Sequence, residues 1–455
     1  MRRGELGGVR VLVAGAGLAG LAAARDLMTN GADVAVVDAR TRVGGRVWTV
    51  RQPFSAGQHA EAGGDMIEHD QLEIRRLAAD LGLTLTRILR TGFGYARPDG
   101  SGRMRIAGPA TARGWERIAQ ALGPLIHAYH LAEQSWDSPI AGDLASRSVA
   151  QWLDEIGADD ELRTTAMGLR GFFLADPHDL SLLALVDQFA SSSESSADWK
   201  MYRIKGGNHR LAAALAATIG NRLKLETEVV AVSHRGRTVR VSVKDAGAVS
   251  QMNCDYVIFA LPATLLRRIP ISPALPAQQH DAIVRLKYGR ATRTLLQFSR
   301  RFWRAPGRPR ALGSPLPVGA MWEGNEEQPG RSGILSLLAG GGASDATQSL
   351  IAKDGINALV GSLGWLGARE KDLLGSHQTV WEPDPWARGG YAFFDPSYDA
   401  VFRAWLSRPC GRLFFAGEHT SVRWQGYTNG AIESGRRAAA EIAATHRLAG
   451  RATPA

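Results

Sequence analysis

Residues 9–38 read VRVLVAGAGLAGLAAARDLMTNGADVAVVD, and this stretch decides the fold. An apolar run leads into a glycine-rich turn, a helix-forming segment follows, and a second apolar run ends at Asp38. We expect Gly15 to permit a tight turn, Gly17 to let the backbone approach a pyrophosphate, and Gly20 to let the helix pack on the sheet. The helix N-terminus would hold the phosphates, and Asp38 would accept hydrogen bonds from an adenosine ribose, where its charge disfavours a 2′-phosphate. The stretch therefore predicts a dinucleotide-binding unit.

A second pair of glycines follows directly, in the sequence ARTRVGGR of residues 39–46. A nicotinamide enzyme has no evident use for this pair, whereas a longer cofactor lying extended across the domain does. Gly44 and Gly45 would let the chain pass close to the pyrophosphate, and Arg46 would supply positive charge to it. The alternative is a solvated arginine loop. With the first stretch, these residues resemble the start of the flavin-containing amine oxidase family, whose cofactor is FAD.

The resemblance covers nearly the whole chain, in the same order of segments, and it implies an α/β fold. It implies a Rossmann-like FAD-binding domain of the glutathione-reductase type, built from discontinuous segments, and an α+β substrate-binding domain. A chain of 455 residues is long enough for two domains. We expect residues 1–85, 200–270 and 377–455 to form the FAD-binding domain, and residues 86–199 and 271–376 to form the substrate-binding domain.

The apolar patterns predict the elements of this fold. We expect helices at residues 21–28, 71–81, 119–132, 148–156, 180–190, 210–219, 263–269 and 430–447. We expect strands at residues 9–14, 34–37, 228–233, 238–243, 255–262, 292–298, 334–338 and 412–417. The strands at 292–298 and 334–338 suggest a sheet that forms the floor of a substrate cavity.

The composition is that of an ordinary globular protein, with 45% hydrophobic and 22% charged residues. The formal net charge is +10, but the basic residues are mostly arginines scattered along the chain, so we expect no nucleic-acid partner. Cys254 and Cys410 make neither a disulfide framework nor a metal site, and no metal is expected. We see no signal peptide and no membrane anchor, and we expect a cytoplasmic protein. For the oligomeric state, a homodimer is one of the alternatives that the sequence leaves open.

The block GEHTSVRWQGYTNGA at residues 417–431 is the strongest signal after the first. A strand ends at Gly417 and a helix starts near Gly430, so the helix N-terminus can face the electron-rich edge of a flavin. The block is similar to the last FAD contact of the family, and closely so to that of polyamine oxidases. The resemblance implies Glu418 near the ribityl chain, with Thr428 and Ala431 beside the flavin. A glycine-rich loop before an ordinary helix is the alternative.

Tyr391 and Tyr427 match the two positions at which monoamine oxidases carry aromatic rings that sandwich the substrate amine on the flavin face. Aromatic faces attract cationic nitrogen and can orient a neutral one. Each tyrosine alone would more often belong to a core or a rim, but two at both matched positions favour the cage. Monoamine oxidases attach FAD to a cysteine just before the first ring, and this chain has Gly390 there. The resemblance therefore implies non-covalent FAD, with Trp386 packed near its ring system.

The third block is EAGGDMIEH at residues 61–69. Its diglycine again suits close passage by the cofactor. Glu68 matches a tunnel-lining glutamate of plant-type polyamine oxidases, where a carboxylate would attract a cationic substrate and help deprotonate it. Equally, Glu68 could be a surface glutamate at the start of a helix, where its charge suits the helix dipole.

Arg293 is the main departure from the family. Most of its oxidases have a lysine here that holds a water against flavin N5. Arginine is bulkier, stays protonated and binds in a fork, so it does not position the same water in the same way. This puts the reaction with oxygen in doubt, and Arg293 would instead bind a carboxylate or carbonyl of the substrate, or form a salt bridge in the core.

The resemblance assigns the catalytic roles to Arg293, Tyr391, Tyr427 and Glu68. It assigns cofactor contacts to Gly15, Ala16, Gly17, Gly20, Asp38, Ala39, Arg40, Gly45, Arg46, Gly63, Gly64, Asp65, Met66, Val229, Trp386, Gly417, Glu418, Gly426, Tyr427, Thr428 and Ala431.

The activity implied is oxidation of a C–N bond in a small-molecule amine or amide to an imine. Hydride passes to flavin N5 and oxygen reoxidises the flavin to give hydrogen peroxide, in a setting that the Arg293 departure suggests is secondary metabolism. An L-amino-acid oxidase is a competing interpretation. Such enzymes usually place an arginine soon after the Gly63-Gly64 pair, and here only Arg170 or Arg293 could replace it. A flavoprotein desaturase or dehydrogenase also stays open, as does a non-catalytic flavoprotein.

Overall fold

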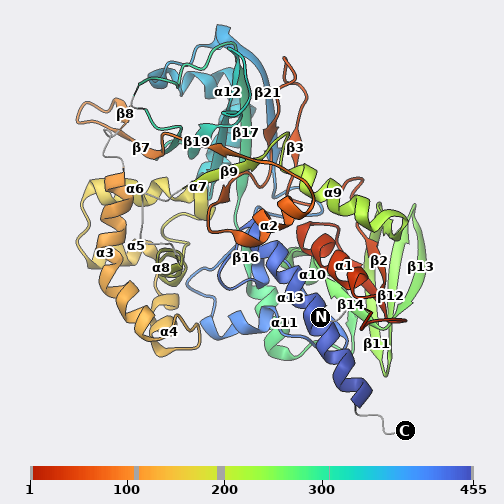
Figure 1. The fold of residues 1–455 in the computed structure, drawn as a ribbon. Coiled ribbons are helices and arrows are strands. Elements are labelled where there is room, and N and C mark those ends of the chain that lie inside the picture. The colour runs from red at the N-terminus through yellow and green to blue at the C-terminus, as the bar shows by residue number, and fades with distance from the viewer. Residues whose placement is uncertain (1–3, 107–111, 192–199, 307, 452–455) are drawn as a thin grey trace.

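A five-stranded parallel sheet organises the N- and C-terminal segments of the chain. The computed structural model describes residues 4–106, 112–191, 200–306 and 308–451 (Figure 1). The strand order is β10-β2-β1-β14-β23. The strands are β1 (Arg10–Ala14), β2 (Asp33–Val37), β10 (Leu223–Lys224), β14 (Tyr256–Phe259) and β23 (Leu413–Phe415). β1 pairs with β14, which follows it by about 240 residues, and β14 pairs with β23, so one sheet joins three distant parts of the chain.

Both faces of this sheet are apolar and covered: helices pack on one face, and the antiparallel strands of residues 227–254 pack on the other. Alternate residues of β1 point to opposite faces: Val11 and Val13 enter one hydrophobic core, and Leu12 and Ala14 enter another. The first core is formed with α1 (Leu18–Thr29), α2 (Leu72–Asp80), α9 (His209–Ile219) and α13 (Thr428–Arg451). A Cβ on Gly435 of α13 would lie 2.1 Å from the carbonyl oxygen of Ala19, so α1 and α13 cross with almost no space between their backbones.

A four-stranded sheet stands beside the parallel one, in the order β13-β12-β11-β15 (Figure 1). Its strands are β11 (Thr227–Arg235), β12 (Thr238–Asp245), β13 (Ala248–Cys254) and β15 (Ile271–Ser272). The register of β11 and β12 shifts between Val229 and Ala231, which marks a bulge next to the parallel sheet. A short helix, α10 (Ala263–Leu266), follows β14.

A seven-stranded sheet forms the other large layer, in the order β21-β17-β20-β19-β18-β7-β8. Its strands are β7 (Phe93–Pro98), β8 (Met104–Ile106), β17 (Ala291–Phe298), β18 (Ala311–Gly313), β19 (Ala320–Glu323), β20 (Gly333–Gly340) and β21 (Leu373–Val380). Every residue of β17 and β20 is buried. On one side they contact α12 (Gly342–Gly361), which lies along β17 in Figure 1.

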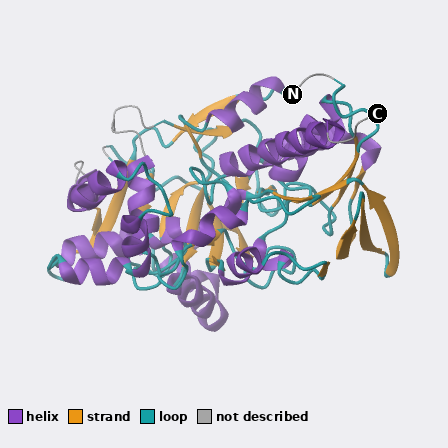
Figure 2. Cartoon of the chain, turned by 90° about the horizontal axis from the view of Figure 1, so that it is seen from below, coloured by secondary structure: helices purple, strands orange, loops and turns teal. Residues whose placement is uncertain are grey.

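A group of helices between residues 112 and 191 lies at the end of the molecule opposite the β11–β13 strands, as Figure 2 shows from a second direction. These helices are α3 (Ala112–Leu131), α4 (Pro139–Ser146), α5 (Val149–Glu155), α6 (Asp160–Gly168), α7 (Arg170–Phe173) and α8 (Leu182–Ser191). A capping box at Ser148 precedes α5. The Ser148 hydroxyl accepts from the backbone amide of Gln151, and the Gln151 side-chain oxygen accepts from the backbone amide of Ser148.

Short pairings connect these layers. They are β3 (Thr49–Val50) with β4 (Ala60–Glu61), β5 (Ile67–Glu68) and β6 (Leu85–Ile88) with β9 (Met201–Ile204), and β16 (Lys287–Tyr288) with β22 (Ala392–Phe393). Helix α11 (Ala277–Arg285) precedes β16. No helix of the described residues is long and apolar enough to cross a membrane.

The observed elements agree with the predicted α/β fold, and the expected helices and strands are present with shifted ends. The first helix begins at Leu18, three residues before the expected start, because the glycine turn itself enters the helix. The prediction missed β13, whose sequence AVSQMNC is exposed over most of its length and lacks an apolar run. It also missed β7, β8, β18 and β19, which are short and acquire partners only through the seven-stranded sheet.

Candidate active site

The first glycine turn connects β1 to α1, and the folded chain itself requires glycine at two of its three positions. Gly15 has φ +108°, and a Cβ there would lie 2.6 Å from the carbonyl oxygen of Ala260. A Cβ on Gly20 would lie 1.9 Å from the carbonyl oxygen of Gly15. A Cβ on Gly17 would meet no described atom within 4 Å. Since Gly17 is also the residue before α1, the open space lies at the N-terminus of this helix, where an anion is stabilised.

Asp38 stands at the end of β2 and closes this turn. One carboxylate oxygen accepts the amide of Ala16 at 2.7 Å, and the other accepts the amide of Arg40 at 2.8 Å. Burial raises the pKa of Asp38, and these two amides act in the opposite direction. The guanidinium of Arg40 points to another partner, Asp384, at 2.6 Å. Asp38 therefore fixes the turn in addition to facing the cavity described below.

The second glycine pair lies against the first turn. Gly44 pairs with Gly17, and its amide donates to the carbonyl oxygen of Ala16 at 2.9 Å. The Arg46 side chain that follows donates to the carbonyl oxygen of Gly390 at 2.6 Å and to Glu418 at 3.0 Å. The two glycine turns and the C-terminal block thus meet at one place, although nearly 400 residues separate them in the sequence.

Glu418 is the centre of this meeting point. It is 6% exposed and lies just after β23. Besides Arg46, its carboxylate accepts the amide of Gly426 at 2.9 Å and that of Ala392 at 3.3 Å. A single buried carboxylate thereby ties three segments together, and their positions depend on one another.

Helix α13 begins at Thr428, directly after this turn. The Thr428 hydroxyl is buried and has no hydrogen-bond partner among the described residues. A Cβ on Gly64 would lie 2.9 Å from the Thr428 methyl group, so the diglycine of the third block packs against the start of α13. A buried hydroxyl without a partner at a helix N-terminus fits a ligand group that supplies the missing bond.

A connected cavity of about 1490 Å³ joins these parts. Of the residues expected to contact the cofactor or the substrate, all line the cavity except Ala16 and Gly20, which lie behind the turn. Its size exceeds that of a usual small-molecule pocket and suits a dinucleotide with a second molecule beside it. The open helix N-terminus at Gly17 fits the pyrophosphate of FAD, and the unpartnered Thr428 hydroxyl fits its flavin ring.

The two tyrosines lie in the same cavity. The Tyr391 hydroxyl donates to the carbonyl oxygen of Phe172, and the Tyr427 hydroxyl accepts the Gln188 side-chain amide at 3.3 Å. Burial raises the pKa of both phenols, so both rings stay neutral. A Cβ on Gly426 would lie 3.2 Å from the Tyr391 ring, which leaves this ring little freedom to move. The structure therefore brings the predicted aromatic pair together.

Glu68 also lines the cavity and is hydrogen-bonded to Tyr427. It belongs to β5, before α2 begins at Leu72, and not to the first turn of that helix. Burial, followed by the charge of Asp70, raises its pKa to about 7, while the bond to Tyr427 lowers it. Of the two interpretations of Glu68, this placement favours the cavity over the helix dipole.

Arg293 extends from β17 into the cavity and is 5% exposed. It donates to the Ser336 hydroxyl at 2.8 Å and to the carbonyl oxygen of Gly63 at 3.2 Å. Its guanidinium lies 4.3 Å from the centre of the Trp322 ring, and its nearest ion-pair contact, with Asp65, is 4.0 Å. Arg293 is therefore held firmly, without a close salt bridge.

Asp65 lines the cavity, but the structure gives its carboxylate protein partners. It accepts from Arg203 at 2.7 Å and from the Trp322 indole at 2.6 Å. Arg203 is fully buried and also contacts Glu327 at 2.7 Å. Sequence reasoning missed Trp322 and Gln188, which line the cavity, and Arg203, which holds Asp65 without lining it. No local pattern marks a side chain that reaches such a place from a distant element.

Arg170 does not take the place expected of a carboxylate-binding arginine. Its guanidinium donates to the carbonyl oxygens of Pro315 and Leu316 and lies 3.5 Å from Asp176, outside the cavity lining. Arg293 is the arginine that the structure places beside the aromatic pair.

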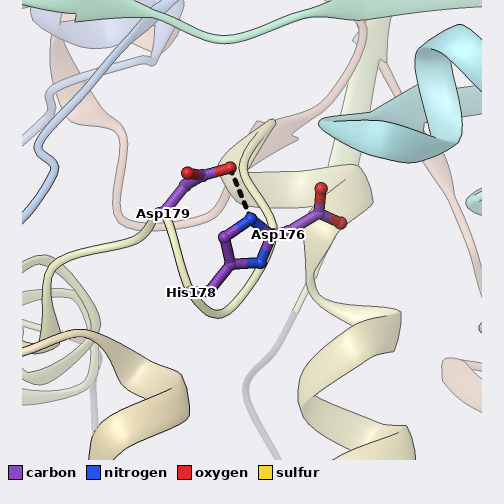
Figure 3. A group of neighbouring side chains, drawn as sticks. All are labelled: Asp176, His178 and Asp179. Atoms are coloured by element: carbon purple, nitrogen blue, oxygen red, sulfur yellow. Dashed lines mark ion pairs between the residues drawn. The ribbon is translucent and has the colours of Figure 1, made fainter.

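Asp176, His178 and Asp179 form a separate polar cluster, drawn in Figure 3, with one potential ligand atom from each within 4.8 Å of the others. His178 lies beside Asp179 at 3.3 Å. Asp176 already accepts the Gly342 amide at 2.7 Å, at the start of α12, besides its contact with Arg170. Through its bond to the Gly342 amide, Asp176 caps the start of α12. Both cysteines are free thiols.

Comparisons with known proteins point in one direction. A profile of the protein family described as flavin containing amine oxidoreductase matches residues 18–443. AofH of Mycobacterium tuberculosis, named as a flavin-containing monoamine oxidase, is 30% identical over 457 residues, covering 96% of this chain and 97% of its own. Flavin-containing amine oxidase B of Homo sapiens is 25% identical over 458 residues, covering 95% and 85%.

Solved structures show the same similarity. Cyclohexylamine oxidase from Brevibacterium oxydans superimposes with a TM-score of 0.85 at 26% identity, covering 96% of this chain and 99% of its own. Putrescine oxidase bound to putrescine gives a TM-score of 0.82 at 25% identity, with the same coverage.

Proposed function

Since the chain belongs to the family of flavin-containing amine oxidoreductases, we propose that it oxidises a C–N bond in a small-molecule amine or amide to an imine. The protein is an FAD-dependent enzyme, as its family is, and not a non-catalytic flavoprotein. The observation that carries the proposal is the shared cavity, in which an aromatic pair and a glutamate lie beside the dinucleotide-type turns. Residues 1–85, 200–270 and 377–455 are proposed as the FAD-binding domain, and residues 86–199 and 271–376 as the substrate-binding domain. Strand β21 runs across the last of these boundaries.

When bound, FAD supplies an acceptor for the hydride of the substrate C–H bond and a route for the electrons to oxygen, which gives hydrogen peroxide. The neutral rings of Tyr391 and Tyr427 would hold the amine between them. Glu68, hydrogen-bonded to Tyr427, would attract the substrate ammonium and take the proton that must leave before oxidation. Arg293 is the fourth catalytic residue that we propose, because it lines the same cavity.

We propose that the FAD is bound non-covalently. A cysteine side chain at Gly390 would have its Cβ 2.4 Å from Leu174 and 2.9 Å from Ala291, so the position has room only for glycine. We also propose a role in secondary metabolism, a cytoplasmic location and a homodimer. Cell fractionation and the mass in solution test the last two.

The second candidate activity is that of an L-amino-acid oxidase, which Arg293 in the cavity favours. Anaerobic reduction of the bound flavin by a panel of amines, amides and amino acids tests both candidates. We expect at least one compound to bleach the flavin, and air to restore the colour with release of hydrogen peroxide.

Tyr427→Phe and Tyr398→Phe make a matched pair for this experiment, because Tyr398 is buried outside the cavity lining. Only Tyr427→Phe should slow the anaerobic reduction of the flavin. A flavin that stays oxidised with every compound of the panel would contradict the proposal.

A further inference from the structure

The two tyrosines have neighbours of opposite charge in the same cavity. Glu68 is hydrogen-bonded to Tyr427, and Arg293 interacts electrostatically with Tyr391. All four side chains line one cavity. An ammonium or amine is attracted to the carboxylate, which leaves the guanidinium to face another part of the same substrate.

The Arg293 guanidinium has more donors than its protein partners use. It carries five N–H bonds, and among the described residues only the Ser336 hydroxyl and the Gly63 carbonyl accept hydrogen bonds from it. Its Nε is buried without a partner. Asp65 is the nearest carboxylate, at 4.0 Å, and it makes its close ion pair with Arg203, at 2.6 Å. Arg293 therefore keeps a charge and donors that its surroundings only partly satisfy.

The position of Arg293 is fixed independently of any substrate. The side chain is stacked over Trp322, and its two hydrogen bonds come from β20 and from the diglycine of the third block. A pre-positioned planar fork of donors is the arrangement that recognises a carboxylate or a carbonyl oxygen, and little side-chain entropy is lost when such a group binds.

Resting on the proposed amine oxidation, we propose that the substrate carries an acceptor oxygen, as a carboxylate or an amide carbonyl, on the carbon next to the one that bears the amine, and that Arg293 binds this oxygen. The substrate is then an α-amino acid or its amide. Its side chain is apolar, because Phe93, Phe172 and Trp381 line the same cavity, and the first two rings meet edge to face at 5.1 Å. A simple amine would leave the buried guanidinium without its acceptor.

Three compounds that share one side chain test the acceptor oxygen: L-phenylalanine, L-phenylalaninamide and phenethylamine. The measurement is anaerobic reduction of the bound flavin, with the apparent dissociation constant taken from the dependence of rate on concentration. We expect phenethylamine to bind about 10- to 150-fold more weakly than the better of the other two, as for loss of a charged hydrogen bond. A preference for the acid identifies a carboxylate, and a preference for the amide identifies a carbonyl. Equal binding of all three compounds overturns the inference and leaves amine oxidation intact.

Binding of 3-phenylpropanoate and 3-phenylpropan-1-ol to the oxidised holoenzyme gives a readout without turnover, measured by calorimetry and by perturbation of the flavin spectrum. Arg293→Met should weaken binding of the acid by about 10-fold or more and leave the alcohol unchanged. The affinity of Arg293→Lys for the acid should lie between that of the unaltered protein and that of Arg293→Met. Lysine keeps the charge but loses the planar fork of donors. Arg369→Gln is the control, because Arg369 pairs with Asp372 on the surface.

The two experiments separate the inference from the proposed function. If no compound reduces the flavin but binding of the acid still depends on Arg293, the proposal of amine oxidation fails and that of the acceptor site stands. If the acid binds equally well to Arg293→Met with its FAD retained, the inference is wrong, whatever amines the enzyme oxidises.

Discussion

At the scale of single residues, Asp38 shows how one carboxylate can serve both the turn and the cofactor. Its oxygens already accept the amides of Ala16 and Arg40, and they also line the cavity. The ribose contact expected from the sequence therefore adds to a structural role and does not replace it. Removing this carboxylate should weaken cofactor binding through the loss of both the turn contacts and the ribose contact.

We predict that Asp38→Ala weakens FAD binding by about 10- to 150-fold, because a partly buried charged hydrogen bond contributes roughly 1.5–3 kcal/mol. Equilibrium titration of apoprotein with FAD measures the change. Asp33→Ala, at the exposed start of the same strand, is the control and should bind FAD as the unaltered protein does. An unchanged dissociation constant for Asp38→Ala would remove this residue from the site.

Glu68 should give the enzyme a pH dependence near neutrality. Burial raises its pKa to about 7, so Glu68 is a neutral acid below that pH and a carboxylate above it. Because only the carboxylate attracts the substrate cation and accepts its proton, kcat/KM should fall as the pH drops through 7. In Glu68→Gln this limb of the profile should be absent.

Asp70 provides the matched test of this assignment. Its negative charge raises the pKa of Glu68, so Asp70→Asn should move the limb to lower pH without removing it. A limb that stays near pH 7 in Glu68→Gln would belong to another group.

Much of the site could be predicted from the sequence, because glycine turns and the residues next to them form local patterns. Gly15 and Gly20 leave no room for a side chain, as their spacing suggests, and Gly17 leaves open space at the helix N-terminus. The partners of Arg293 could not be predicted. Trp322 lies on β19 and Ser336 on β20, and only the folded sheet brings them within reach of Arg293.

At the scale of elements, the crossing of α1 and α13 decides where two helix N-termini stand in the cavity. Gly435 permits this crossing, since a Cβ there would lie 2.1 Å from the Ala19 carbonyl oxygen. The sequence predicted both helices from their apolar periodicity, but not their closeness, because a glycine inside a helix by itself only lowers helix propensity.

We predict that Gly435→Ala destabilises the protein by about 1–3 kcal/mol, because the added methyl group must push two helix backbones apart. Thermal unfolding of the holoenzyme, followed by circular dichroism, measures the effect. Gly142→Ala in α4 is the control: Gly142 is exposed and a Cβ there meets no described atom within 4 Å, so better helix propensity should leave stability equal or higher. Equal melting temperatures for both variants would show that α1 and α13 can separate freely.

At the scale of the whole molecule, the cavity lies among residues drawn from nearly the full length of the chain, from Ala14 to Ala431. The purified protein should therefore be yellow, and heat or acid should release intact FAD. The released flavin is identified by chromatography, and the polypeptide by its mass. Flavin that remains on the denatured chain would reject non-covalent binding.

FAD should also stabilise the fold, because it binds the folded chain and not the unfolded one. Free FAD at 100 times its dissociation constant adds about 2.7 kcal/mol to the free energy of unfolding. The melting temperature of the apoprotein should rise with added FAD, whereas adenosine monophosphate at the same concentration should raise it less.

The order of strands in the parallel sheet has a consequence for synthesis on the ribosome. β1 pairs with β14, and β14 pairs with β23, so each strand leaves the ribosome well before the partner that follows it in the chain. Glu418, which ties Arg46 to the Gly426 turn, leaves the ribosome later still. A nascent chain stalled near residue 400 has both glycine turns and no partner for Arg46 at the C-terminal block. The cofactor site is therefore complete only after residue 431 has left the ribosome, and the half-made sheet has to be kept from pairing wrongly until then.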